Sequence, residues 1–133
     1  VLLVDDSIVR GNTSRAIVEL VRECGAKKVY FAIYSPPLRY PCVYGIDMQT
    51  RTEFVARDAD AAQVARKIGA DKVIYQPLDN LKAAVRAGNP KLSHFCGACF
   101  DGIYPTGDIT PETLRKIEAE RRGAQTGQME LNI

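Results

Sequence analysis

Hydrophobic residues along the chain alternate between short continuous runs and stretches of helical spacing. The continuous runs predict strands at 1–4, 28–34 and 71–75, and the first of these is expected to be buried on both faces, as in a parallel sheet. Because helical patterns separate the strands, right-handed βαβ crossovers are the expected connections. The pattern therefore predicts an α/β fold with a parallel sheet and flanking helices.

Two helices are expected between these strands. The first follows a capping Asn12 or Thr13 and ends at Gly25, with its apolar stripe at Ile17, Leu20, Val21 and Cys24. On that stripe Cys24 is expected to be a small core residue. The second helix covers 60–68 and ends at Gly69, with inward positions at Ala61, Val64, Ala65 and Ile68.

The connections and the C-terminal part are less regular. Residues 38–48 predict a loop packed against the core, and 50–56 a helical turn in which Thr50 and Glu53 form a capping box. A helix over 80–87 is expected to carry Leu81, Ala84 and Val85 on one side. Residues 88–107 are irregular, a helix starts at Thr110-Pro111-Glu112 and runs to about 122, and a disordered tail is expected at 124–133.

The end of the first strand carries the clearest candidate chemistry. Asp5 and Asp6 stand where ligands bind in open α/β sheets, and adjacent carboxylates can accept hydrogen bonds from a vicinal diol. The following loop, 10–14, brings backbone N–H groups and hydroxyls to the positive end of a helix, which suits a phosphate. A diol at one end and a phosphate at the other describe a ribose 5-phosphate.

The stretch Asp5-Asp6-Ser7-Ile8-Val9-Arg10-Gly11-Asn12-Thr13 closely resembles the phosphoribosyl pyrophosphate (PRPP) signature of the type I phosphoribosyltransferases. Its variant is similar to that of the amidophosphoribosyltransferase family. A second segment carries the same resemblance, from Ser35-Pro36-Pro37 through Pro41-Cys42 to Tyr44-Gly45-Ile46-Asp47. The resemblance implies a partial type I phosphoribosyltransferase fold over residues 1–87, followed by a cysteine-bearing, partly helical extension over 88–123.

The resemblance also implies a reaction and its site. PRPP, glutamine and water would give 5-phosphoribosylamine, pyrophosphate and glutamate, with glutamine-derived ammonia attacking the sugar. Asp5 and Asp6 would be the catalytic pair beside Mg²⁺. The ribose and 5-phosphate of PRPP would contact Asp5, Asp6, Ser7, Ile8, Val9, Arg10, Gly11, Asn12, Thr13 and Ser14. Purine nucleotides would act as feedback inhibitors, and the enzyme would be a homo-oligomer, a tetramer by resemblance.

The cysteines allow three interpretations. The pair Cys96 and Cys99 sits in an irregular loop and could bind an iron–sulfur cluster, could bind zinc with Cys42 and perhaps His94, or could be inert. Resemblance to the iron–sulfur branch of the family favours the first. It implies that Cys42, Cys96 and Cys99 are three ligands of a [4Fe–4S] cluster whose fourth ligand lies outside this sequence.

The composition limits the expected number of domains, binding partners and cellular location. The 133 residues suit one domain, with 46% hydrophobic and 26% charged residues. A net charge of +2 is too balanced to favour nucleic acid or a membrane surface, and a cytoplasmic location is the default expectation. The chain lacks an initiator Met and a glutaminase domain, so we expect a fragment that is inactive alone. The alternatives are a PRPP-binding transcriptional regulator and a salvage phosphoribosyltransferase.

Overall fold

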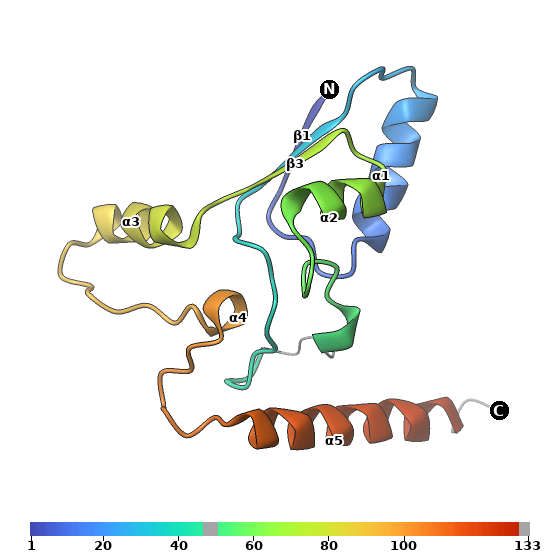
Figure 1. The fold of residues 1–133 in the computed structure, drawn as a ribbon. Coiled ribbons are helices and arrows are strands. Elements are labelled where there is room, and N and C mark those ends of the chain that lie inside the picture. Colours follow the sequence, from blue (N-terminus) through green and yellow to red (C-terminus); the bar gives the residue numbers. More distant parts are fainter. Residues whose placement is uncertain (47–50, 131–133) are drawn as a thin grey trace.

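The computed structural model describes residues 1–46 and 51–130, and the side chains of these residues except 122 and 124–130. Three parallel strands form one sheet in the order β1 (Leu2–Asp5), β2 (Tyr30–Ile33) and β3 (Lys72–Tyr75), as Figure 1 shows. Leu3 lies beside Phe31, and Phe31 beside Val73. All three strands agree with the expected positions, and the parallel pairing confirms the predicted α/β architecture.

Helices α1 (Asn12–Glu23) and α2 (Ala61–Ile68) cover one face of this sheet. Alternate strand residues point toward them, since side chains of a strand alternate between its two faces. The core they form is closed and apolar, with Ile8, Val18, Val29, Phe31, Ile33, Val55, Ala56, Ala59, Val64, Ala65, Ile68 and Val73 all buried.

The opposite face of the sheet is open in this chain. Leu2 and Val4 are 60% and 56% exposed, and Ile74 on β3 is 45% exposed. The expectation that the first strand is buried on both faces is therefore wrong for this chain. Only one face of β1 contributes to the core, because no described helix packs against the other face.

Helix α1 packs only in part through the expected stripe: Val21 packs against the core and Ile17 is half-buried, but two other positions are not covered. Ser14 and Val18 are buried, whereas Leu20 is 59% exposed and Cys24 is also exposed. The helix begins after Gly11 rather than after a capping side chain of Asn12 or Thr13. The lack of a side chain at Gly11 allows the start of the helix to approach Ile68 of α2 closely, and Leu20 lies on the side of the helix away from the core.

Helix α2 follows its sequence signals more closely. The Asp60 side chain accepts the N–H of Gln63, whose own side chain accepts the N–H of Asp60, which completes a capping box. Gly69 ends the helix in the left-handed conformation, as expected. Ala61 is exposed rather than inward, but the other three predicted inward positions are buried.

The remaining elements surround the carboxyl edge of the sheet. They are η1 (Arg51–Glu53), α3 (Leu78–Gly88), α4 (Ala98–Asp101) and α5 (Pro111–Glu130). η1 matches the predicted turn, although Thr50 of the expected capping box lies outside the described residues. Helix α3 confirms the predicted helix and leaves Ala84 and Val85 exposed, whereas α4 was not predicted.

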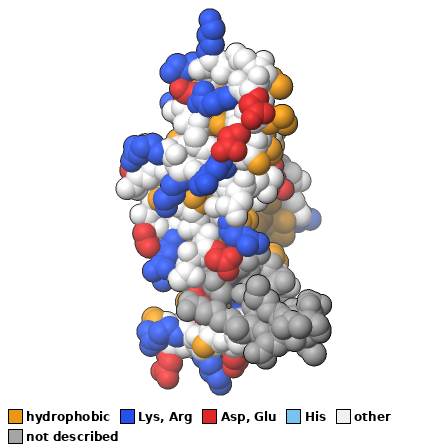
Figure 2. Space-filling view, turned by 90° about the vertical axis from the view of Figure 1, so that its right-hand side faces the viewer, with side chains coloured by type: hydrophobic (Ala, Val, Ile, Leu, Met, Phe, Trp, Pro, Cys, Tyr) orange, Lys and Arg blue, Asp and Glu red, His pale blue; other side chains and the backbone are white. Residues whose placement is uncertain are grey.

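Helix α5 starts as predicted, with the Thr113 N–H donating to Oγ1 of Thr110. It continues to Glu130, so 124–130 are helical where a disordered tail was expected; 131–133 lie outside the described residues. None of the described helices is both long and apolar enough to cross a membrane. Figure 2 shows positive and negative side chains interspersed over one side of the molecule.

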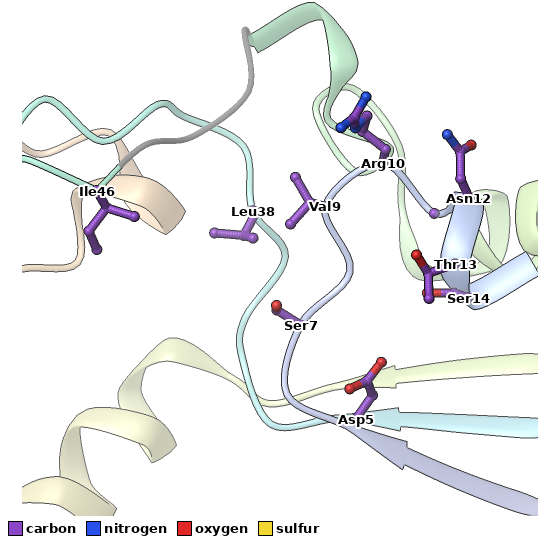
Figure 3. A pocket seen from close by; sticks show the side chains of 10 residues that line it. Asp5, Ser7, Val9, Arg10, Asn12, Thr13, Ser14, Leu38 and Ile46 are labelled. Carbon is purple, nitrogen blue, oxygen red and sulfur yellow. The ribbon is translucent and has the colours of Figure 1, made fainter. Parts of the chain in front are cut away.

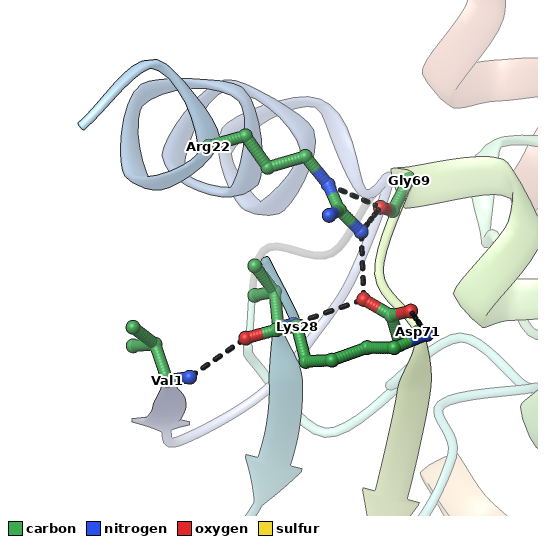
Figure 4. A network of polar contacts seen from close by, with 6 residues as sticks. Val1, Arg22, Lys28, Gly69 and Asp71 are labelled. Atoms are coloured by element: carbon green, nitrogen blue, oxygen red, sulfur yellow. Dashed lines mark hydrogen bonds and ion pairs between the residues drawn. The ribbon is translucent and has the colours of Figure 1, made fainter. Parts of the chain in front are cut away.

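A carboxylate stabilises the edge of the sheet where the strands begin (Figure 4). Asp71 accepts from Nζ of Lys28 and Nη2 of Arg22, each at 2.8 Å, and from the N–H of Val29 at 2.9 Å. Lys28, the Val29 N–H and Arg22 together hold the pKa of Asp71 well below its ordinary value. This network joins α1, β2 and β3 at the end of the sheet away from the candidate site.

Candidate functional site

A cavity of about 700 Å³ opens where the strands end and α1 begins (Figure 3). Its residues come from the predicted 5–14 segment and from one distant loop. They are Asp5, Ser7, Val9, Arg10, Gly11, Asn12, Thr13, Ser14, Leu38 and Ile46. Eight of the ten residues expected to contact PRPP therefore line a single cavity, which is large enough for a sugar phosphate.

The two adjacent carboxylates occupy different positions. Asp5 lines the cavity, and its Oδ1 accepts the N–H of Asp6 at 2.9 Å. Asp6 is exposed and does not line the cavity; its Oδ1 accepts the Ser7 hydroxyl at 2.9 Å. Since each carboxylate retains further acceptor capacity, both can still bind a hydroxyl or a cation.

The loop that follows is held from its far side by the chain before α2. Ile8 is 2% exposed and belongs to the core, so it anchors the loop rather than lining the cavity. The Val9 carbonyl accepts the N–H of Val55 at 2.8 Å, and Nη1 of Arg10 lies 3.3 Å from a carboxylate oxygen of Glu53. These contacts leave the inner side of the loop facing the cavity.

Gly11 shapes the turn into α1. Its φ of 82° lies in the left-handed region that glycine adopts without strain, and a Cβ there would lie 3.1 Å from Cγ2 of Ile68. The helix therefore starts with the N–H groups of Asn12, Thr13 and Ser14 at the cavity, where the first turn has no intrahelical acceptors. Such a terminus with two adjacent hydroxyls is suited to an anion.

Leu38 and Ile46 line the cavity although nothing in the sequence predicted a role for Leu38 there. Both belong to the loop after β2, and Figure 3 shows Leu38 lying between Val9 and Ile46. Leu38 is only 8% exposed. The only signal in the sequence was the large number of apolar side chains in this loop. They indicated that the loop is packed, but not which part of the protein it contacts.

A second cavity, of about 570 Å³, brings the three predicted ligand cysteines together. Its lining is mostly apolar and combines the loop after β2 with the segment around α4: Cys42, Tyr44, Ile46, Cys96, Cys99, Phe100, Pro105 and Thr106. Ile46 contributes to both cavities. The candidate PRPP site and the cysteine site are thus neighbours along one loop.

The thiols differ in their surroundings. Cys42 is 5% exposed and its Sγ accepts the N–H of Tyr44 at 3.4 Å, whereas Cys96 is exposed. Burial, together with the neighbouring Cys42 and Cys96, raises the pKa of Cys99 to about 11. Among the described residues, no group of three or more His, Cys, Asp or Glu could hold a metal ion.

Backbone contacts position the cysteine segment against the loop after β2. The carbonyl of Cys99 accepts the N–H groups of Arg39 and Tyr40, at 3.0 and 3.1 Å. The Tyr104 hydroxyl donates to the carbonyl of Pro41 at 2.8 Å. Gly102 has a φ of 75°, and a Cβ there would lie 3.0 Å from the Tyr40 ring, so glycine is required at this position.

The further candidate zinc ligand, His94, and the remaining cysteine, Cys24, lie elsewhere. His94 is exposed, its Nδ1 lies 2.8 Å from the Ser93 hydroxyl, and it does not line the cysteine cavity. Cys24 is exposed at the end of α1. Zinc coordination through His94 therefore receives no support from this geometry.

Comparison with known proteins gives relatives over most of the chain. It is 54% identical over 121 residues to the amidophosphoribosyltransferase of Pasteurella multocida and 48% identical over 126 residues to that of Escherichia coli, which covers 91% and 90% of the chain. No family model matches. The chain spans about one quarter of the length of these relatives, 24% and 25%.

Solved structures agree with the curated relatives. Glutamine PRPP amidotransferase from B. subtilis, complexed with ADP and GMP, has a TM-score of 0.70 and 41% identity, covering 78% of this chain and 23% of that one. A structure described as the allosteric regulatory enzyme of purine biosynthesis has a TM-score of 0.72 and 40% identity, with 84% and 24% covered. Over the segment that it spans, the chain is therefore similar in sequence and in fold to amidophosphoribosyltransferases, and its parallel sheet with flanking helices is consistent with part of a phosphoribosyltransferase fold.

Proposed function

We propose that this segment carries the PRPP-binding part of an enzyme that makes 5-phosphoribosylamine from PRPP and glutamine-derived ammonia. The observation that carries the proposal is the single cavity that joins Asp5 to the N-terminus of α1. The amidophosphoribosyltransferase relatives support it over a transcriptional regulator or a salvage phosphoribosyltransferase. The rest of the enzyme would supply ammonia from glutamine.

The two ends of the cavity suit the two ends of a ribose 5-phosphate. The N–H groups and hydroxyls of Thr13 and Ser14 would bind the 5-phosphate, since charge-assisted hydrogen bonds to an anion are strong. The Asp5 carboxylate, at the carboxyl end of β1, would accept hydrogen bonds from the ribose hydroxyls. Binding at both ends would fix the position of C1, where ammonia attacks.

The reaction requires charge stabilisation and alignment more than proton transfer. As the bond from C1 to pyrophosphate breaks and the bond from ammonia nitrogen forms, the sugar gains positive charge. Asp5 and Asp6 would stabilise that charge, an effect worth about 3 kcal/mol for one well-placed partner. Their oxygens are also the kind that Mg²⁺ prefers, and Mg²⁺ bound with PRPP would neutralise the leaving pyrophosphate.

The cysteine cavity is proposed to hold a [4Fe–4S] cluster. Three thiols line one largely apolar cavity, which fits a cluster held by cysteine thiolates. In a cubane each thiolate binds a different iron, so the sulfurs need not converge on one point. Cys42, Cys96 and Cys99 would be three of its four ligands.

The same phosphate loop is proposed to bind purine nucleotides. A nucleoside 5′-monophosphate carries the ribose phosphate for which the cavity is suited, and the B. subtilis relative was solved with ADP and GMP. AMP or GMP should therefore compete with PRPP. Adenosine or guanosine should not, because each lacks the phosphate.

The test compares Thr13→Val with Thr13→Ser in the full-length enzyme, with ammonia as nitrogen donor. Thr13→Val keeps the shape but removes a hydroxyl, and should raise the KM for PRPP and the inhibition constant of AMP together, each by about fivefold. Thr13→Ser, which retains the hydroxyl, should change neither by more than about twofold. Equal inhibition by AMP and adenosine, or unchanged constants in Thr13→Val, would contradict the proposed phosphate site.

A further inference from the structure

The guanidinium of Arg39 holds a turn that lies directly behind the phosphate loop. Its Nη1 donates to the carbonyls of Ala56 and Arg57, at 2.9 and 3.2 Å, and its Nη2 to the carbonyl of Ala59 at 3.3 Å. Three carbonyls of one turn thus converge on one cation. The planar, forked donor set of arginine suits this arrangement, and a lysine ammonium could not span it as well.

This turn needs an internal partner for its carbonyls because it is buried. Val55, Ala56 and Ala59 are 9%, 0% and 5% exposed. Buried carbonyls without donors are costly, and outside helices and sheets a side chain must satisfy them. Arg39 therefore satisfies three carbonyls of the turn, while Nζ of Lys67 donates to the carbonyl of Val55 at 3.1 Å.

The turn 55–59 contacts the phosphate loop, residues 9–14, at two points. The N–H of Val55 donates to the Val9 carbonyl at 2.8 Å. A Cβ on Gly11 would lie 3.4 Å from Cγ2 of Val55, so the turn also limits the space at the start of α1. A shift of the turn would move Val9 and Gly11 and, with them, the N–H groups that face the cavity.

The backbone of Arg39 is fixed from the other side. Its N–H donates to the carbonyl of Cys99 at 3.0 Å, next to the cysteine cavity. Its side chain does not line the candidate PRPP cavity, although that of its neighbour Leu38 does. With its guanidinium occupied by three carbonyls, Arg39 is not placed to bind the phosphate itself.

We infer that Arg39 is a positioning residue for the 5-phosphate of PRPP, acting through the turn 55–59 on the loop 9–14. The inference rests on the proposed function of that loop. Because it anchors at Cys99, Arg39 also links the cysteine segment mechanically to the sugar-phosphate site. A positioning role of this kind affects ligand affinity by displacing donors from their best geometry, without removing any of them.

The experiment uses the full-length enzyme with ammonia as nitrogen donor. Arg39→Met removes the donors and the charge but keeps a long side chain; Arg39→Lys keeps the charge and loses the fork. Arg22→Met is the matched control. Arg22 also donates to a backbone carbonyl, that of Gly69, yet lies at the opposite end of the sheet. Each variant is measured for kcat, the KM for PRPP, calorimetric affinity for ribose 5-phosphate and the urea midpoint of unfolding.

Arg39→Met should raise the KM for PRPP and the Kd for ribose 5-phosphate by about tenfold, with kcat changed by less than about threefold. Arg39→Lys should give an intermediate increase. Arg22→Met should lower the urea midpoint while leaving both constants within about twofold. If Arg39→Met does not fold, Arg39→Lys decides the question in the same comparison.

Unchanged KM and Kd in the Arg39 variants, or equal increases in Arg22→Met, would overturn the inference. Failure of the proposed function gives a different result: the wild-type enzyme would then form no phosphoribosylamine. The calorimetric comparison of the variants does not depend on turnover, so it still tests Arg39 when the wild-type enzyme binds ribose 5-phosphate but forms no phosphoribosylamine.

Discussion

Gly11 lies so close to Ile68 that a Cβ on Gly11 would stand 3.1 Å from Cγ2 of Ile68. This contact joins the first turn of α1 to the last residue of α2. The contact determines how closely the N-terminus of α1 approaches the core. It thereby also determines the position of Gly11 in the wall of the candidate PRPP cavity.

Gly11→Ala should therefore destabilise the protein and weaken PRPP binding together. The positive φ alone costs an alanine about 1 kcal/mol, and displacing Ile68 adds to that. Gly25→Ala is the matched control, because Gly25 also has a positive φ, of 93°, but no atom lies within 4 Å of its virtual Cβ. Urea unfolding and the KM for PRPP check both variants. An equal loss of stability in both, with unchanged KM, would contradict the role given to the Gly11–Ile68 contact.

The cysteines give a prediction about metal content. Full-length protein prepared without oxygen should contain iron and sulfide, and Cys96→Ser should lose both and unfold at a lower temperature, because cluster binding is linked to folding. Cys24→Ser should keep the metal, since Cys24 lies on α1 away from the cysteine cavity. Elemental analysis decides the matter. Zinc instead of iron, or iron retained in Cys96→Ser, would contradict the proposal.

Much of this site could be predicted from the sequence because its signals are local. The strand, the carboxylates, the glycine and the helix start follow one another within residues 1–14, and the structure gathers most of them around one cavity. The stop of the second helix at Gly69 was equally local and is confirmed, whereas the capping box of Asp60 and Gln63 was not predicted. Such features depend on neighbours in sequence, so propensity and spacing suffice to identify them.

Other features depend on tertiary packing and could not be predicted in this way. Hydrophobic spacing alone placed Leu20 and Cys24 on the buried stripe, whereas the buried residues of the helix are Ser14 and Val18. The contribution of Leu38 arises from a loop that returns across the site. Hydrophobic periodicity predicts helices and strands, but it does not predict which residues a loop contacts.

The ion pairs of Asp71 lead to a prediction about how the stability of the protein depends on pH. Because its partners lower its pKa from 3.8, the ion pairs contribute stability above about pH 4, and that stability is lost as the pH falls below 3.8 toward the folded-state value. Asp71→Asn should therefore lower the urea midpoint of the full-length protein at pH 7. The difference from wild type should shrink as the pH approaches 3. A difference that stayed constant between pH 7 and pH 3 would show that the charge of Asp71 is not what stabilises this edge.

The most direct measurement of the central claim is the activity of Asp5→Asn in the full-length enzyme. Asp5 lines the cavity at the end of β1, and this substitution keeps its size while removing its charge. Phosphoribosylamine formation from PRPP and ammonia should fall in kcat/KM by about 2–4 kcal/mol of transition-state stabilisation, while glutamine hydrolysis remains close to wild type. Wild-type phosphoribosylamine formation by Asp5→Asn would contradict the claim that this cavity binds and activates PRPP.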